Sequence, residues 1–157
     1  MIYRKATFDD VETIYEMVYS YAQQGAMLAR SRNTLYETLR DMIVAEENGR
    51  VIGVGGLHFI WECLAEVRTM AVASDCLRRG VGQGIVTRLI EEGRDYGARC
   101  IFTLTYQVDF FASLGFQTIA KAKLPPKVWK DCIDCPKFPN CDEVAMVLEL
   151  QNENESS

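Results

Sequence analysis

The stretch CLRRGVGQGIV, Cys76 to Val86, sets three glycines at alternate positions beside two arginines. It follows a strand-like segment, Ala65 to Val72, and leads into the apolar periodicity of an amphipathic helix. Where a strand passes through a loop into a helix, unpaired backbone N–H groups gather at the helix N-terminus and can bind an anion. Glycines leave that backbone bare because they lack Cβ. The stretch therefore predicts a site for a small anion, to which Arg78 and Arg79 add positive charge.

Taken alone, the glycine stretch fits a loop that only needs small residues as well as it fits an anion site. Spacing excludes two well-defined phosphate motifs. No Lys-Ser or Lys-Thr follows the last glycine, as a P-loop requires. Gly80, Gly82 and Gly84 also lack the G-x-G-x-x-G spacing of a dinucleotide fingerprint.

The whole chain has 157 residues, the usual size of one compact domain. We expect that domain to span residues 1–150 and a disordered polar tail to span 151–157. The formal net charge of −5 argues against a nucleic-acid partner, whose footprint would be basic. No apolar run is long enough to span a membrane, and the start, MIYRKATFDD, has no signal-peptide pattern. We therefore expect a cytoplasmic protein with reduced cysteines and no membrane partner.

The expected elements mix antiparallel hairpins with one crossover, which predicts an α/β fold with a mixed sheet. Asn48-Gly49 between two apolar runs predicts a hairpin over 43–60. In the strand 65–72, Val67, Thr69 and Ala71 are expected to face away from the residues between them. The other expected helices are 7–25, 34–42, 83–98 and 109–116, and the other expected strands are 2–7, 100–106 and 143–150.

Two motifs resemble those of the GNAT superfamily of acetyl-CoA-dependent N-acetyltransferases. MAVASDCLRRGVGQGIVTRLI, residues 70–90, resembles motif A, whose pattern is Gln/Arg-x-x-Gly-x-Gly/Ala. FFASLGF, residues 110–116, resembles motif B, x-Tyr-x-x-x-Gly-Phe. The resemblance covers residues 1 to about 150. It implies the GNAT fold, a central mixed, mostly antiparallel sheet with helices on both faces, and acetyl-CoA as cosubstrate.

The resemblance also implies which residues bind the cosubstrate. Backbone N–H groups of the loop would hold the pyrophosphate, and the edge of the preceding strand would pair with the amide-bearing pantetheine arm. The implied residues are Arg78, Arg79, Gly80, Val81, Gly82, Gln83 and Gly84 for the pyrophosphate, Met70, Ala71 and Val72 for the arm, and Phe111 from motif B.

Two positions depart from the family pattern. Leu77 stands where the family has Gln or Arg. A register that starts at Arg79 would restore a cation, but it changes the distance from Val72, and we favour the first register. Phe111 replaces the motif B tyrosine, the family's usual general acid for the leaving thiolate. Phenylalanine cannot donate a proton, so water or Tyr106 is left for that role.

Transfer to an amine needs a base, because the amine is mostly protonated at neutral pH. Glu66 matches the glutamate that serves as general base in the histone-acetylating branch of the superfamily, although it also fits a solvated partner for Arg68. His58, the only histidine, is the second candidate and also fits a packed strand residue. A main-chain N–H from Met70 or Ala71 is expected to stabilise the oxyanion.

A narrower resemblance concerns the acceptor. Segments 25–59 and 101–116 resemble the acetyltransferase domain of bacterial N-acetylglutamate synthase, which implies glutamate as acceptor, in arginine biosynthesis. No amino-acid-kinase-like segment is seen and segment 127–143 differs from that enzyme, so we expect a short, single-domain form. Two carboxylates call for cations, each of which also fits a solvated surface residue. The best candidates are Arg30 and Arg32, and the weaker ones are Arg68, Lys127 and Lys130.

The cysteine-rich segment gives a further alternative. Cys132, Cys135 and Cys141 have the spacing C-x2-C-x5-C, whereas a structural zinc site needs four ligands. Reduced thiols are therefore favoured over a metal site or a redox pair, and no metal is expected.

Two other functions stay open: acetylation of another small amine or of a protein amine, and acetyl-CoA binding by a regulator without turnover. Leu77 and Phe111 are the features that keep the regulator open. The sequence leaves a homodimer open as well.

Overall fold

The computed structural model describes residues 1–27, 29–124 and 143–150. The chain divides into two compact units. Unit 1 is Met1–His58 with Val67–Glu92, and unit 2 is Phe59–Glu66 with Gly93–Ser157. Strands β3 (Arg50–Trp61) and β4 (Leu64–Val72) run through both units. Within the described ranges, no helix has the length and apolarity that a membrane span needs.

Unit 1 contains β1 (Ile2–Lys5), β2 (Met42–Glu47) and much of β3 and β4. β1 pairs antiparallel with β2, and β2 pairs antiparallel with β3. Asn48 and Gly49 join β2 to β3 with φ of 52° and 79°. Two central residues with positive φ are what a type I′ hairpin turn needs, so the predicted hairpin is confirmed.

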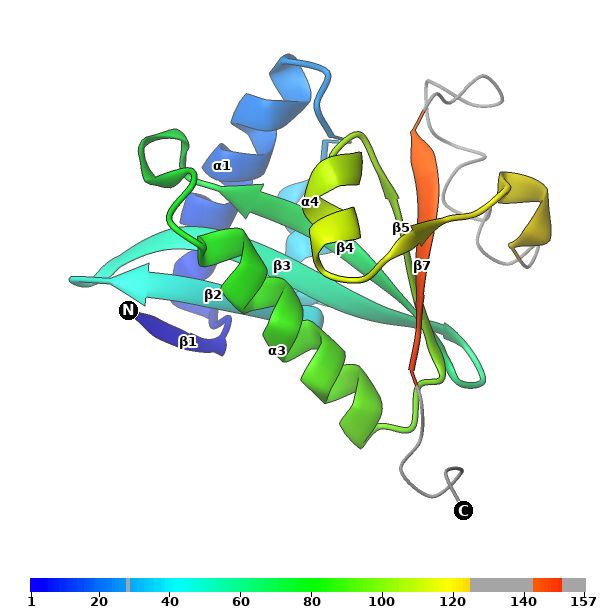
Figure 1. The fold of residues 1–157 in the computed structure, drawn as a ribbon. Helices are drawn as coiled ribbons and strands as arrows, with labels where there is room; N and C mark the ends of the chain where they lie inside the picture. The colour runs from blue at the N-terminus through cyan, green and yellow to red at the C-terminus, as the bar shows by residue number, and fades with distance from the viewer. Residues whose placement is uncertain (28, 125–142, 151–157) are drawn as a thin grey trace. The chain divides into compact units, whose positions relative to one another are not determined.

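Helices cover both faces of the unit 1 strands (Figure 1). On one face lie α1 (Val11–Gln23) and α2 (Arg32–Glu37), and the buried core there contains Val11, Ile14, Val18, Leu35, Val44 and Val54. On the other face, α3 (Val81–Asp95) packs against glycines of β3. A Cβ on Gly53 would lie 2.8 Å from Val81 Cγ1, and a Cβ on Gly55 would lie 2.6 Å from Ile85 Cγ2. The glycines therefore let α3 sit close to the sheet.

Unit 2 is built around β5 (Cys100–Thr105) and β7 (Val144–Glu149). β5 runs parallel to the first residues of β4 and antiparallel to β7, and the short β6 (Gln117–Thr118) pairs antiparallel with β7. The helix of this unit is α4 (Val108–Ser113). Phe102, Leu124 and Ala145 form a buried cluster in this unit.

The strand order is β1-β2-β3-β4-β5-β7-β6, and the predicted mixed, mostly antiparallel α/β fold is confirmed. Some predicted boundaries are wrong. α2 begins at Arg32 rather than Thr34, because Ser31 caps it by accepting a hydrogen bond from the Thr34 N–H at 3.1 Å. Met42 belongs to β2, and α3 begins at Val81 rather than Gln83.

Candidate active site

Strand β4 carries the predicted base and the predicted cofactor edge, and it is not a regular strand. Ala65, Glu66 and Val67 are buried at three consecutive positions. Thr69 has φ of 59°, which is an outlier for a β-branched residue. Both faces of β4 are therefore covered at Ala65–Val67, and the positive φ at Thr69 interrupts the predicted alternation of faces at that residue. The backbone at Thr69 thus departs from extended geometry immediately before Met70, and such departures are frequent beside active sites.

The C-terminal end of β4 is held in unit 1 by α1. The Tyr21 hydroxyl donates a hydrogen bond to the Val72 carbonyl at 2.5 Å. Burial raises the pKa of Tyr21, so the phenol stays protonated and keeps its donor role. The next residue, Ala73, donates its N–H to the Ile52 carbonyl at 2.8 Å. The strand end that was predicted to pair with the pantetheine arm is therefore fixed from two sides.

The loop that follows β4 was predicted to bind an anion, and its backbone includes two residues with positive φ. Arg78 and Gly80 have φ of 64° and 79°, and left-handed residues in a loop can turn successive N–H groups toward one point. The Gly84 N–H donates to the Gly80 carbonyl at 3.0 Å, which closes the first turn of α3. The three preceding N–H groups of the helix have no acceptor within it, because they lie in its first turn. A Cβ on Gly80 would meet nothing within 4 Å, so the space beside the loop is open.

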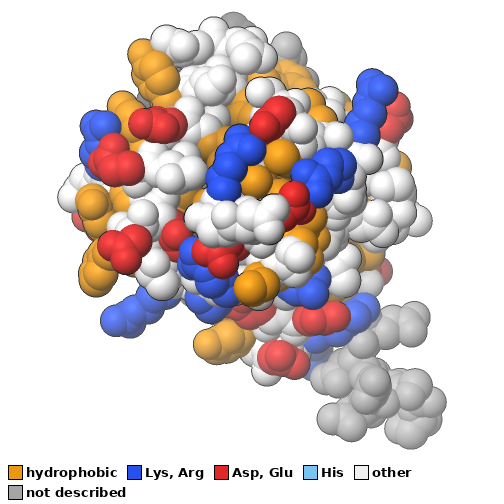
Figure 2. All heavy atoms as spheres, turned by 90° about the vertical axis from the view of Figure 1, so that its left-hand side faces the viewer, with side chains coloured by type: hydrophobic (Ala, Val, Ile, Leu, Met, Phe, Trp, Pro, Cys, Tyr) orange, Lys and Arg blue, Asp and Glu red, His pale blue; other side chains and the backbone are white. Residues whose placement is uncertain are grey.

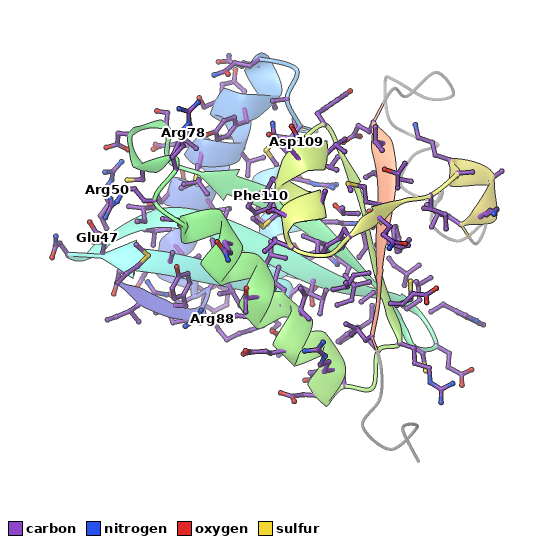
Figure 3. All side chains as sticks on the ribbon, viewed as in Figure 1. Glu47, Arg50, Arg78, Arg88, Asp109 and Phe110 are labelled. Carbon is purple, nitrogen blue, oxygen red and sulfur yellow. The ribbon has the colours of Figure 1, made fainter. Side chains whose placement is uncertain are left out.

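The two loop arginines have different surroundings. Arg79 forms an ion pair with Glu47 at 2.5 Å and donates to Cys76 Sγ at 3.7 Å. Arg78 has no ion pair with any residue that the structure describes. Figure 2 shows basic and acidic side chains interspersed on this face, and Figure 3 shows Arg78 and Glu47 at the same end of unit 1. Leu77 is 52% exposed, so the loop presents an apolar side chain beside Arg78.

Gly84 has a packing role. A Cβ on Gly84 would lie 2.8 Å from Tyr3 Cε1 and closer still to the Tyr3 hydroxyl. The Arg88 guanidinium lies over the same tyrosine ring, 3.9 Å from its centre. Because the Gly84 N–H is already bonded within α3, this glycine serves the contact between α3 and β1.

The two candidate bases lie on neighbouring strands of the chain. Glu66, on β4, is only 5% exposed. His58, on β3, is half-buried, and its Nδ1 lies 2.9 Å from Asp41 Oδ2. A proton on Nδ1 that is donated to Asp41 leaves the Nε2 lone pair to accept a proton. Sequence reasoning missed Asp41, because no local pattern links it to the histidine.

The predicted acceptor cations are not equivalent. Arg32 forms a bidentate ion pair with Glu12 at 2.7 and 3.1 Å, and its guanidinium lies 3.9 Å from the centre of the Tyr15 ring. The pair lowers the pKa of Glu12 and raises that of Arg32. Arg30 and Arg68 are both half-buried. Two of the weaker candidates, Lys127 and Lys130, lie outside the described residues.

Unit 2 contains the remaining predicted residues. Tyr106 follows β5 and is half-buried. Phe111 is 3% exposed, and its ring centre lies 5.0 Å from that of Phe110 and 5.2 Å from that of Phe116. Phe111 is thus a core residue of unit 2, and a cofactor contact by it stays a prediction. Among the described residues, no three potential ligands are grouped for a metal, and the cysteine segment 132–141 lies outside them.

A mixed sheet whose β4 strand leads through a glycine-rich loop into α3 is the arrangement expected of an acetyl-CoA-dependent acetyltransferase. The comparison with known families agrees with this class. The chain belongs to the Acetyltransferase (GNAT) family, whose profile matches residues 8–116.

The chain is also similar to individual acetyltransferases of known sequence or structure. An uncharacterized N-acetyltransferase of Chlorobaculum tepidum is 37% identical, over 94% of this chain and 95% of its own length. The amino-acid acetyltransferase of Mycobacterium tuberculosis is 35% identical, over 83% of this chain and 76% of its own. The N-acetylglutamate synthase of Neisseria gonorrhoeae, solved with coenzyme A and N-acetyl-glutamate, superposes with a TM-score of 0.88 at 25% identity. That match covers 96% of this chain and 35% of the synthase.

Proposed function

We propose that this enzyme transfers the acetyl group of acetyl-CoA to the α-amino group of an amino acid, and that L-glutamate is the acceptor. The observation that carries the acceptor is the match of nearly the whole chain to the synthase that was solved with N-acetyl-glutamate. The similarity to an amino-acid acetyltransferase supports the same class of acceptor. In this proposal the reaction is the first step of arginine biosynthesis and takes place in the cytoplasm.

The residues of unit 1 fit the phosphates of acetyl-CoA, which supplies the acetyl group as a thioester. The N–H groups of Val81, Gly82 and Gln83 lie at the N-terminus of α3, where the helix dipole is positive. Gly80 leaves open space beside them, and Arg78 adds a charge that no described residue neutralises. We assign the pyrophosphate to this loop and the pantetheine arm to Met70–Val72.

The proposed chemistry is a direct attack by the acceptor amine without an acetyl-enzyme. Glu66 takes the proton of the ammonium group, through a water molecule, and so makes the amine nucleophilic. A main-chain N–H of Met70 or Ala71 donates to the oxygen on which negative charge develops. The departure from extended geometry at Thr69 supports this role, because it alters how those N–H groups are presented. Tyr106 or water returns a proton to the thiolate.

The acceptor carboxylates need cations, and we assign them to Arg30 and Arg68. Arg32 already holds Glu12 through Nε and Nη2, so binding of an acceptor carboxylate by this guanidinium would compete with that ion pair.

The test is the release of coenzyme A, followed with a thiol reagent, across the proteinogenic amino acids. We expect acceptor-dependent release with L-glutamate above all others. Arg30→Ala should raise the KM for glutamate about tenfold or more, because a charged hydrogen bond contributes about 1.5–3 kcal/mol. The KM for acetyl-CoA should stay nearly constant in this variant. Release that depends on a polyamine or a peptide, and not on glutamate, would refute the assignment of the acceptor.

A further inference from the structure

The turn between β2 and β3 is joined by two ion pairs to loop 73–80, which is called the phosphate loop because the pyrophosphate is assigned to it. Glu47, just before the turn, pairs with Arg79 of the loop at 2.5 Å. Arg50, just after the turn, pairs with Asp75 of the short 3-10 turn Ser74–Cys76. The hairpin thus contributes the carboxylate Glu47 to the first pair and the guanidinium of Arg50 to the second. The two pairs therefore stabilise one orientation of the loop relative to the turn.

The geometry of the second pair is bidentate. Arg50 Nη1 lies 2.9 Å from Asp75 Oδ2, and Nη2 lies 3.0 Å from Oδ1. The Arg50 guanidinium holds the pKa of Asp75 at about 2, so this carboxylate stays ionised at neutral pH. Between the two pairs, the buried Cys76 thiol donates to Asp75 at 3.5 Å and accepts from Arg79 at 3.7 Å. One continuous network thus connects the hairpin with the loop.

The loop needs such support because of its backbone. Arg78 is a non-glycine residue at φ of 64°, an unfavourable conformation that persists only where neighbouring groups fix it. The turn on the other side is stiff, because Asn48 and Gly49 form a tight hairpin connection. The ion pairs join the strained segment to the stiff one. A loop that is ordered before binding avoids the entropy cost of ordering it when the ligand arrives.

We propose that the β2–β3 turn is part of the acetyl-CoA site, with Glu47 and Arg50 as positioning residues that hold the phosphate loop in its binding conformation. Arg79 then belongs to this brace, and Arg78 is the loop arginine left for the phosphate. The inference rests on the proposed phosphate loop and is independent of the identity of the acceptor.

The experiment measures the Kd of coenzyme A by isothermal titration calorimetry, which needs no acceptor. Arg50→Ala and Glu47→Gln should each raise the Kd about threefold to fivefold, since exposed ion pairs contribute up to about 1 kcal/mol. The exchange variant Arg50→Glu with Asp75→Arg should recover at least half of the loss. In kinetics, the KM for acetyl-CoA should rise while kcat and the acceptor KM stay constant.

The matched control is Glu92→Gln, which breaks the exposed pair of Lys5 with Glu92 at 3.2 Å on another part of unit 1. Its Kd should stay within about twofold of the parent value, because a surface pair far from the site contributes to stability at most. Melting temperatures of all variants confirm that each is folded.

Three results separate the possible failures. If Arg78→Ala and Gly80→Ala left the Kd unchanged, the phosphate loop itself would be misassigned. If those two variants raised the Kd but Arg50→Ala did not, the brace would be refuted and the loop assignment kept. A lower Kd in Glu47→Gln would also overturn the proposal, because it would show that Glu47 only competes with the phosphates for Arg79.

Discussion

Gly84→Ala tests whether this glycine serves the packing of α3 or the binding of phosphate. The added Cβ would lie 2.8 Å from Tyr3 Cε1, inside the normal contact distance of about 3.5–4.0 Å. The tyrosine ring must therefore move, and it gives up its contact with the Arg88 guanidinium, 3.9 Å from the ring centre. Such overpacking costs about 1–3 kcal/mol.

The helix itself favours the substitution. Alanine is better than glycine in a helix interior by about 0.8–1.0 kcal/mol. The two effects together predict a net destabilisation of about 1 kcal/mol, which lowers the melting temperature by about 2–4 °C in a chain of this size. In a Tyr3→Ala background the steric term disappears, and Gly84→Ala should become stabilising by about 0.5–1 kcal/mol. The coupling energy between the two positions is then about 2 kcal/mol.

The assay is urea unfolding of the parent, the two single variants and the double variant, together with calorimetric titration of coenzyme A. The Kd should change little, because the Gly84 N–H is already bonded to the Gly80 carbonyl. An equal effect of Gly84→Ala with and without Tyr3 would refute the steric argument. A large rise in Kd without any loss of stability would return this glycine to the phosphate site.

Three other predictions concern the site. Leu77→Arg should lower the KM for acetyl-CoA about threefold to tenfold at low ionic strength, because it adds a cation to an exposed loop position, and the gain should shrink in high salt; a gain that persists in high salt would speak against an electrostatic origin. Tyr21→Phe should lower the free energy of unfolding in urea by about 1–2 kcal/mol, because it leaves the Val72 carbonyl without its donor. In steady-state kinetics it should raise the KM for acetyl-CoA more than it lowers kcat. Glu66→Gln should lower kcat about 100-fold or more, whereas His58→Gln should lower it only a few-fold; the reverse order in a kcat comparison would move the role of base to the histidine.

The parts of the fold that were predictable are those with local signals. Asn48-Gly49 defines its turn by two adjacent residues, and the turn has the expected positive φ at both. The strand, loop and helix around the glycine stretch were also predictable, because the apolar periodicity that indicates each element lies within a short segment. The start of α2 was missed because Ser31 competes with Thr34 as a cap, and only the backbone direction decides between two such residues.

The parts that were not predictable depend on residues far apart in the chain. The Tyr21 hydroxyl and the Val72 carbonyl are 51 positions apart, and Arg79 and Glu47 are 32 apart. Such pairs follow from the packing of α1 and of the β2–β3 turn, which no short pattern encodes. Thr69 is a different case, because a β-branched residue at positive φ contradicts its own local preference. Surrounding structure must impose that conformation, and this is typical of functional strands.

The balance of charge supports the proposal that the loop binds acetyl-CoA mainly through its backbone. The chain has a formal net charge of −5 and binds an anionic cosubstrate, so the attraction must be local. Glu47, Arg79, Arg50 and Asp75 neutralise one another in two pairs, and Leu77 stands at the position where the resemblance implies Gln or Arg. What is left is Arg78 and the start of α3, whose partial charge of about +0.5 comes from fixed peptide dipoles. Because the effect of the helix dipole falls off within the first turn, the position of the phosphates relative to the start of α3 matters more here than the total charge of the loop. This is the physical reason to expect the two ion pairs between the β2–β3 turn and the loop to influence the affinity for acetyl-CoA.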